Sequence, residues 1–269
     1  MKVVIRADAS IQIGTGHVMR CLTLAEGLKD KSTQVEFICR EHEGNMIDYI
    51  ENRGFKVHAI PVLKKDTGKP LPSKLDVKNI LEHGDWLGST QEQDAEICHL
   101  ILNKLVTDWL IVDHYSLDQV WQMKLHDCFQ KLMVIDDLAD RRHKCNLLID
   151  QNFYKNLNLR YSNLVPKNCK LMLGPEFAIL RDEFKILKKK VRDHDGIIKN
   201  IVIFFGGSDV DNYTRITIDA LSELGLDGIT VDVIVGKLHP DLKIIRERCK
   251  DLNYILHVQT KNIGLIFLN

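Results

Sequence analysis

A histidine follows two glycines at the point where a short apolar stretch gives way to a helical pattern. The segment "GTGHVMRC" places Gly14 and Gly16 just before His17. Glycine permits positive φ and lets a ligand approach the backbone closely. The positive end of a helix disfavours the imidazolium form, so a ring on the first turn is expected to be neutral at pH 7. A neutral imidazole can accept a proton from water, which is the task of a general base.

The same turn suits an anion. Unpaired amide groups at the start of a helix favour a negatively charged group such as a pyrophosphate. The dinucleotide fingerprint Gly-x-Gly-x-x-Gly requires a glycine where Met19 stands, and the chain has no Gly-Lys-Ser or Gly-Lys-Thr of a phosphate loop. A structural interpretation, in which His17 is only a polar residue that starts a helix, stays open at this point.

Polar side chains also follow four apolar segments that are typical of buried strands. Because the carboxyl ends of parallel strands meet at one edge of a sheet, we expect these side chains to converge on a ligand. The alternative for each is a turn or a helix cap, where Asp and Asn are common. The binding residues predicted at this edge are Asp8, Asp113, Asp137, Gln151 and Asn152, with His114, Tyr115, Asp136 and Asp150 beside them.

The elements that must position these residues alternate between strand and helix. Continuous apolar runs predict strands, and apolar residues at helical spacing predict the helices between them. Strict alternation indicates a parallel sheet with helices on both faces. Strands are predicted at 2–8, 35–39, 56–60, 108–115, 131–137 and 145–152, helices at 17–30, 46–52, 93–105 and 117–129, and a long loop with one helical turn at 61–90.

The pattern changes around residues 177–199, where a helix ending in a charged stretch predicts the crossing into a second domain. A strand, a glycine turn and a helix then recur from "NIVIFFGGSD" onward, with further strands at 230–236 and 253–258. We predict an α/β protein with two Rossmann-like, doubly wound parallel-sheet domains at 1–185 and 186–269. About three strands in the second domain are fewer than such sheets usually contain, so we expect this domain to be incomplete.

Composition narrows the function classes. The 269 residues contain 37 Lys and Arg and 37 Asp and Glu, so the formal net charge is zero. This balance predicts neither a nucleic-acid partner nor a membrane partner. Arg6 and Asp8 interrupt the first apolar stretch, and no run approaches the roughly 20 apolar residues of a membrane span. The seven cysteines form no Cys-x-x-Cys pair and the histidines lack metal-ligand spacing, which predicts a reduced cytoplasmic protein without a metal site.

Several segments, in order, resemble a known family. They are "RADASIQIGTGHVMRCLTLAEGL", "DWLGSTQEQDAE", "LIVDHYSLD", "VIDDLADRRHKCNLLIDQN", "LGPEFAILRDEF" and "FFGGSD". Together they resemble the UDP-sugar hydrolases of pseudaminic acid biosynthesis, which act on a UDP-2,4-diacetamido-2,4,6-trideoxy hexose. The resemblance implies a two-domain fold of the GT-B type, similar to the peptidoglycan N-acetylglucosaminyl transferase. It implies a small-molecule UDP-sugar as the partner and no cofactor. We predict a monomer, although the residues themselves leave the oligomeric state open.

The resemblance also implies a reaction and roles for single residues. Water would attack the anomeric carbon, and the bond to UDP would break with inversion. His17 matches the catalytic histidine of the family, and Tyr115 matches a tyrosine that positions water or sugar. Gly206, Gly207 and Ser208 match a glycine turn near the nucleotide. Relatives continue with a further strand and a glycine-rich turn that helps to hold uridine, so we expect a shortened nucleotide site.

Two alternatives stay open from the sequence. A glycosyltransferase of the GT-B type would use the same fold with an acceptor other than water. An inactive sugar-nucleotide-binding fragment would retain the fold without turnover. The identity of the product separates the first alternative from a hydrolase, and the binding of UDP separates the second.

Overall fold

The chain folds into two compact units, Met1–Ile179 and Leu180–Asn269, whose boundary lies near the predicted one between residues 185 and 186. Both are α/β units with parallel sheets, so the predicted fold class is confirmed. The computed structural model describes residues 1–29, 32–63, 81–191, 196–207, 209, 211–237, 239–260 and 262–268. Each unit is described by itself.

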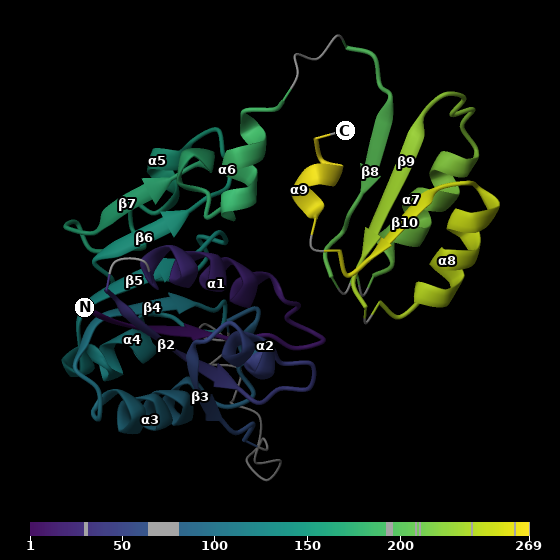
Figure 1. Ribbon diagram of the computed structural model, residues 1–269. Coiled ribbons are helices and arrows are strands. Elements are labelled where there is room, and N and C mark those ends of the chain that lie inside the picture. The colour runs from purple at the N-terminus through teal and green to yellow at the C-terminus, as the bar shows by residue number, and fades with distance from the viewer. Residues whose placement is uncertain are drawn as a thin grey trace, which may run out of the picture. The chain divides into compact units, whose positions relative to one another are not determined.

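The first unit contains a seven-stranded parallel sheet in the order β3-β2-β1-β4-β5-β6-β7 (Figure 1). The chain leaves β1 toward β2 and β3 on one side, then returns to place β4 on the other side of β1. The order of strands therefore reverses between β1 and β4, and ligands of open α/β sheets bind beyond the carboxyl ends at such a switch point. The strands are β1 (Lys2–Ala7), β2 (Gln34–Arg40), β3 (Lys56–Ile60), β4 (Thr107–Asp113), β5 (Phe129–Ile135), β6 (Leu147–Asp150) and β7 (Lys170–Leu173).

Helices cover both faces of this sheet (Figure 1). On one face, Val3 and Ile5 of β1 pack in one core with residues of α1 (Gly16–Lys29) and α2 (Ile47–Asn52). On the other, Val4 packs in a second core with residues of α3 and α4. Alternate residues of one strand thus enter two cores, which explains why the strand is apolar throughout. The remaining helices of this unit are η2 (Gly84–Leu87), α3 (Gln91–Leu102), α4 (Gln119–Lys124), η3 (His126–Cys128), α5 (Leu157–Arg160) and η4 (Pro175–Phe177).

A buried group of charges ties α3 to the strands. Arg6, Arg40 and Asp94 are fully buried, and Asp94 accepts hydrogen bonds from Arg6 Nη2 at 2.8 Å and from Arg40 Nη2 at 2.7 Å. The indole N–H of Trp121 also donates to Asp94, at 2.8 Å. Burial raises the pKa of Asp94, but Arg6 outweighs it and the pKa falls to about 2. Each buried charge therefore has a partner of opposite sign, without which its burial would be costly.

Several elements differ from the prediction. The helix expected at 117–129 is a short α4 followed by the 3-10 turn η3. The helix expected over 177–199 is shorter: α6 spans Asp182–Lys188, and none of its side chains is fully buried. Strand β7 was not predicted; it lies at the edge of the sheet and has no fully buried side chain. Residues 64–80 of the predicted loop lie outside the described part of the chain.

The second unit is a three-stranded parallel sheet in the order β10-β9-β8, and the three strands predicted here are present. At its carboxyl edge the backbone of Gly207, after β8, lies against Gly236, after β9. A helix, α6, packs against the last helix, α9. Within the described ranges, no helix combines the length and apolar character needed to cross a bilayer. The elements are β8 (Asn200–Ile203), α7 (Tyr213–Ser222), β9 (Thr230–Val235), α8 (Leu242–Asp251), β10 (Ile255–Val258) and α9 (Ile263–Ile266).

The contact between Gly207 and Gly236 predicts a strong effect of a single methyl group. A Cβ at Gly236 would lie 2.7 Å from the Gly207 carbonyl carbon, so Gly236→Ala has to move backbone. We expect a loss of about 1–3 kcal/mol in the free energy of unfolding, measured by urea titration. Gly225→Ala is the control, because a Cβ there meets no atom within 4 Å. Equal stability of the two variants would contradict this packing.

Candidate active site

The first two predicted site residues meet at the switch point of the larger sheet. His17 is the second residue of α1, and Asp113 is the last residue of β4. Nδ1 of His17 lies 2.6 Å from Oδ1 of Asp113, and the carboxylate is fully buried. A carboxylate can only accept a hydrogen bond, so Nδ1 carries a proton, and in the neutral ring the lone pair is on Nε2. Nε2 has no hydrogen-bond partner among the described residues.

Arg20, which was not among the residues predicted from the sequence, holds the pair of His17 and Asp113 in place. Arg20 donates from Nε and Nη2 to the two oxygens of Asp113, at 2.5 and 2.7 Å. From Nη1 it also donates to Asp137, at 3.2 Å. Arg20 lies three residues after His17 on α1, so both side chains lie on one face of the helix. The spacing in "GHVMR" is the signal by which the sequence could have revealed it.

Asp137 fixes the position of the Tyr115 ring, which lies beside the His17 ring. The hydroxyl of Tyr115 donates to Oδ1 of Asp137 at 2.5 Å, while Arg20 occupies the other oxygen. The Tyr115 ring meets the His17 ring edge to face, with centroids 4.5 Å apart. Each of the two rings is therefore held by its own carboxylate, and one guanidinium joins the two carboxylates.

Charges in this group follow from burial and from these contacts. Burial raises the pKa of Asp113, but His17 and Arg20 outweigh it and bring the pKa well below its usual range. Burial, and then the hydrogen bond to Asp137, raise the pKa of the Tyr115 hydroxyl. At neutral pH Asp113 is a carboxylate and Tyr115 is an uncharged phenol. Asp113 therefore stabilises the imidazolium that forms when Nε2 takes a proton, an effect that the helix end alone does not provide.

Asp8 lies beneath this group. It is fully buried, and it accepts from both Nη groups of Arg6, from the backbone N–H of Arg40 at 2.7 Å and from His114 Nε2 at 3.1 Å. Nδ1 of His114 accepts the backbone N–H of Ser116 at 3.1 Å, so the proton lies on Nε2. Burial lowers the pKa of His114, which keeps this ring neutral. The geometry supports a structural role for Asp8 beneath the site rather than the direct substrate contact predicted for it.

The two glycines of the turn differ from one another. Gly14 has φ of 77° and its N–H donates to Ser10 O at 2.9 Å, so this position requires glycine. Gly16 begins α1 without positive φ, and a Cβ there would meet no atom within 4 Å. Positive φ therefore applies to Gly14 alone, whereas Gly16 leaves open space beside His17.

The end of β6 forms a separate group. Oε1 of Gln151 accepts the backbone N–H of Ile179 at 3.2 Å, and Asn152 is exposed. Neither side chain has a hydrogen bond to the group around His17 among the described residues. The link is Arg160, which donates to the carbonyl of Asp137 at 2.6 Å and to Asp150 at 3.1 Å.

In the second unit, the predicted glycine turn follows β8. Gly206 has φ of 90°, and a Cβ there would meet no atom within 4 Å. Ser208 lies outside the described residues. Asp209 accepts the N–H groups of Tyr213 at 3.0 Å and Thr214 at 2.8 Å, and so begins α7.

Asp209 also faces a histidine in an arrangement that repeats the one beneath His17. His239 Nε2 lies 3.3 Å from Asp209, and His239 Nδ1 accepts the N–H of Asp241 at 3.1 Å. In both units a buried aspartate after the first strand thus pairs with a histidine whose tautomer is fixed by the amide two residues later.

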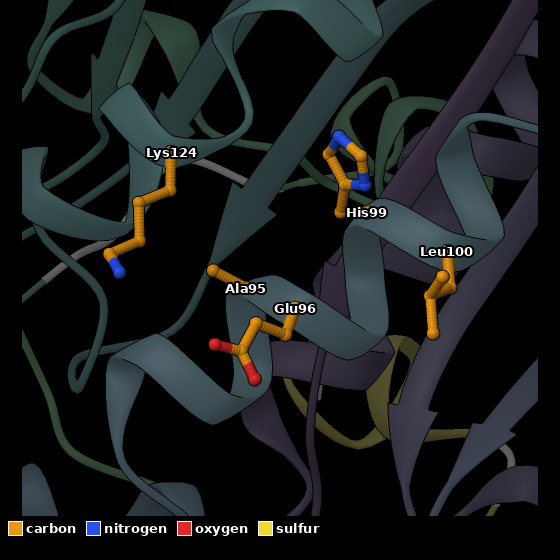
Figure 2. A pocket seen from close by; sticks show the side chains of 5 residues that line it. All are labelled: Ala95, Glu96, His99, Leu100 and Lys124. Atoms are coloured by element: carbon orange, nitrogen blue, oxygen red, sulfur yellow. The ribbon is translucent and has the colours of Figure 1, made fainter.

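A surface hollow lies away from these residues. It has a volume of about 380 Å³ between α3 and α4 (Figure 2). None of its lining residues belongs to the group around His17. They are Ala95, Glu96, His99, Leu100 and Lys124. Among the described residues, no three His, Cys, Asp or Glu side chains are grouped to hold a metal ion.

Known proteins resemble this chain along most of its length, although no family model matches it. UDP-2,4-diacetamido-2,4,6-trideoxy-beta-L-altropyranose hydrolase of Campylobacter jejuni is 29% identical over 268 residues, which cover 98% of this chain and 80% of that protein. The resemblance to this hydrolase family is confirmed. The uncharacterized protein MJ1062 of Methanocaldococcus jannaschii is 25% identical to this chain over 240 residues, which cover 88% of this chain and 43% of MJ1062.

A solved structure agrees on the fold. The complex of Arabidopsis thaliana UGT89C1 with UDP-L-rhamnose matches this chain with a TM-score of 0.55 at 12% identity, covering 96% of this chain and 69% of UGT89C1. At this identity the match concerns the fold alone. It agrees with the two-domain α/β class expected from the sequence.

The pairing of Arg20 with Asp113 predicts a pH-dependent loss of stability. Arg20→Gln leaves a buried carboxylate without its guanidinium, so we expect a loss of about 2–4 kcal/mol in the free energy of unfolding at pH 7. Because the pKa of Asp113 is depressed, its stabilising contribution is present above the unfolded-state pKa near 3.9 and is lost as the pH falls below it. The difference between wild type and variant should therefore shrink between about pH 5 and pH 2.

Chemical denaturation across this pH range measures the effect. Arg53→Gln is the matched control, because its pair with Glu26 is 45% and 44% exposed and should contribute about 0–1 kcal/mol. If Arg20→Gln cost no more than Arg53→Gln at pH 7, the guanidinium would not be compensating Asp113.

Proposed function

We propose that this chain hydrolyses a UDP-2,4-diacetamido-2,4,6-trideoxy hexose to the free sugar and UDP. The reaction cleaves the anomeric C–O bond with inversion. The observation that carries the proposal is the pairing of His17 with Asp113 at the switch point, which leaves Nε2 as a proton acceptor. The relationship to a UDP-sugar hydrolase over 98% of the chain supports the choice of substrate.

The reaction needs one base. Water attacks the anomeric carbon and its proton passes to Nε2 of His17. The bond from that carbon to the phosphate oxygen breaks, and its electron pair leaves with UDP. Asp113 stabilises the imidazolium so formed. Because UDP is a good leaving group, the second carboxylic acid of ordinary glycosidases is not required.

Other groups of the first unit bind and orient the substrate. The unpaired amides at the start of α1 favour the pyrophosphate, and the open space at Gly16 lets it approach the backbone. The hydroxyl of Tyr115, held by Asp137, orients water or sugar beside His17. Arg20 has both of its carboxylate partners within the protein, so its role is to hold the two rings.

For the second unit we propose nucleotide binding at the turn of Gly206, Gly207 and Ser208. The positive φ of Gly206 and the space around it support a close approach of ligand to backbone. We place the reaction in the cytoplasm, which is supported by free thiols at all seven cysteines. The monomeric state stays a prediction.

The product identifies the reaction. The UDP-sugar is incubated with the chain without any added acceptor, and proton NMR follows the anomeric signal. A hydrolase releases free sugar whose first-formed anomer is inverted. Intact substrate that is consumed only when an alcohol acceptor is added would identify a transferase instead. The absence of both turnover and UDP binding by calorimetry would identify an inactive fragment.

Replacing the base should abolish turnover without unfolding the protein. His17→Ala removes the proton acceptor, so kcat should fall by about 10²–10⁴-fold. UDP release in a coupled assay measures the rate, and thermal unfolding verifies the fold. His99→Ala, in the hollow of Figure 2, is the control and should retain the wild-type rate. A His17→Ala enzyme with most of the wild-type rate would refute the assignment.

The space at Gly16 gives a test of the pyrophosphate contact. Gly16→Ala adds a methyl group that meets no protein atom within 4 Å, so the fold should be unaffected. If the pyrophosphate approaches this backbone, KM should rise by about tenfold or more, because the methyl group displaces it. Gly27→Ala in the same helix also meets no atom within 4 Å and should leave KM unchanged. Identical KM values in both variants would place the anion elsewhere.

A further inference from the structure

Three aromatic rings stand together beside the candidate base. The His83 ring lies 4.4 Å from that of Trp86 and 5.5 Å from that of Tyr115, and the Trp86 and Tyr115 rings are 5.9 Å apart. The three rings are mutually tilted by only 32–38°, so they are partly stacked rather than edge to face, and we call this group the aromatic wall. All three side chains are half-buried. Tyr115 connects this wall to His17, 4.5 Å away.

Contacts with the rest of the first unit fix the segment that carries His83 and Trp86. Trp86 belongs to η2. The residue after Trp86, Leu87, is buried in the core that also contains residues of α3 and α4. Gly88 ends η2 with φ of 67°, and its backbone packs closely on the side chains of Arg40 and His42. The hydroxyl of Ser116 donates to the His83 carbonyl and joins η2 to the segment after β4. The rings are thus positioned before any ligand binds.

Trp86 differs from a tryptophan placed for packing. Trp121 is fully buried and donates its indole N–H to Asp94. Trp86 is partly exposed, and within the described part of the chain its indole N–H has no hydrogen-bond acceptor. A tryptophan presents an apolar face and a polar edge, and its partial exposure leaves part of this side chain open to a ligand.

We propose that His83, Trp86 and Tyr115 form the platform on which the sugar of the substrate lies. The class of ligand is an N-acetylated deoxyhexose. Its C–H groups and methyl groups rest on the aromatic faces, and an acetamido carbonyl accepts the Trp86 N–H. This inference rests on the proposed function, because it places the sugar by the position of the base.

The position next to His17 favours sugar over uracil as the occupant. The base must reach a water molecule at the anomeric carbon, so the group beside His17 is the sugar ring. The uracil is separated from that carbon by two phosphates and a ribose. A platform that begins at Tyr115, in contact with His17, therefore takes the hexose.

The aromatic wall also bears on the choice of a deoxy sugar. Ring faces offer no hydrogen bond to a 6-hydroxyl group, whereas a 6-methyl group gains contact with them. A sugar with a hydroxyl at this carbon would leave that group poorly hydrated on the platform. The wall therefore contributes to specificity as well as to affinity.

Tryptophan fluorescence tests the platform without turnover. The probe is the free monosaccharide product, 2,4-diacetamido-2,4,6-trideoxy-L-altrose, titrated into the full chain. It should change the emission of wild type and of Trp109→Phe, but not of Trp86→Phe. UDP alone should not produce this change. If UDP alone changed the Trp86 emission, or if Trp86→Phe responded to the sugar like wild type, the platform would be wrong.

Kinetics with the UDP-sugar provide the second measurement. Trp86→Ala should raise KM about tenfold while kcat stays within about threefold, because the platform binds the ground state and the transition state alike. Trp86→Phe should recover most of the affinity. An unchanged KM in a folded Trp86→Ala enzyme would overturn the proposal. A wild-type chain that binds the monosaccharide through Trp86 but releases no UDP would overturn the hydrolase reaction and leave the platform standing.

Discussion

The negative charge of Asp113 is buried at the end of the central strand β4, and a buried charge needs a partner. The groups that pair with Asp113 determine the arrangement of this site. Arg20 supplies a full charge and His17 supplies a hydrogen bond, and both come from the first turns of α1. The same contacts that make the buried charge tolerable fix the tautomer of the imidazole. Stability and reactivity therefore depend on one set of hydrogen bonds.

The site has two layers, a buried layer of charged residues and a partly exposed layer of aromatic residues. Beneath the site, the buried charges of Arg6, Asp8 and Asp94 join β1 to α3 without reaching solvent. Above it, the three rings of the aromatic wall, including Tyr115, contact one another. The segment after β4 connects the two layers. Asp113 and Tyr115 are separated by one residue, His114, and His114 pairs with the buried Asp8.

The sequence was sufficient to predict which residues lie at this edge of the sheet, but not which of them contact one another. Residues at strand ends are visible as polar breaks after apolar runs, which is why Asp113 and His17 could be named separately. Their contact depends on β1 and β4 being neighbours, and strand order is not written in local periodicity. Arg20 fits the polar face of any helix, so its link to two carboxylates was hidden. Trp86 lies in a segment without periodicity, and β7 is an edge strand without a fully buried side chain.

The histidine beneath the site carries a consequence for how the enzyme responds to acidity. His114 donates to Asp8 and accepts an amide, so both of its ring nitrogens are occupied, and burial lowers its pKa. Near neutral pH His114 therefore stays uncharged, and Arg6 is the partner of full charge for Asp8. A second proton on His114 would go to Nδ1, which already accepts the Ser116 N–H, so strong acid would have to break that hydrogen bond before this buried layer could gain charge.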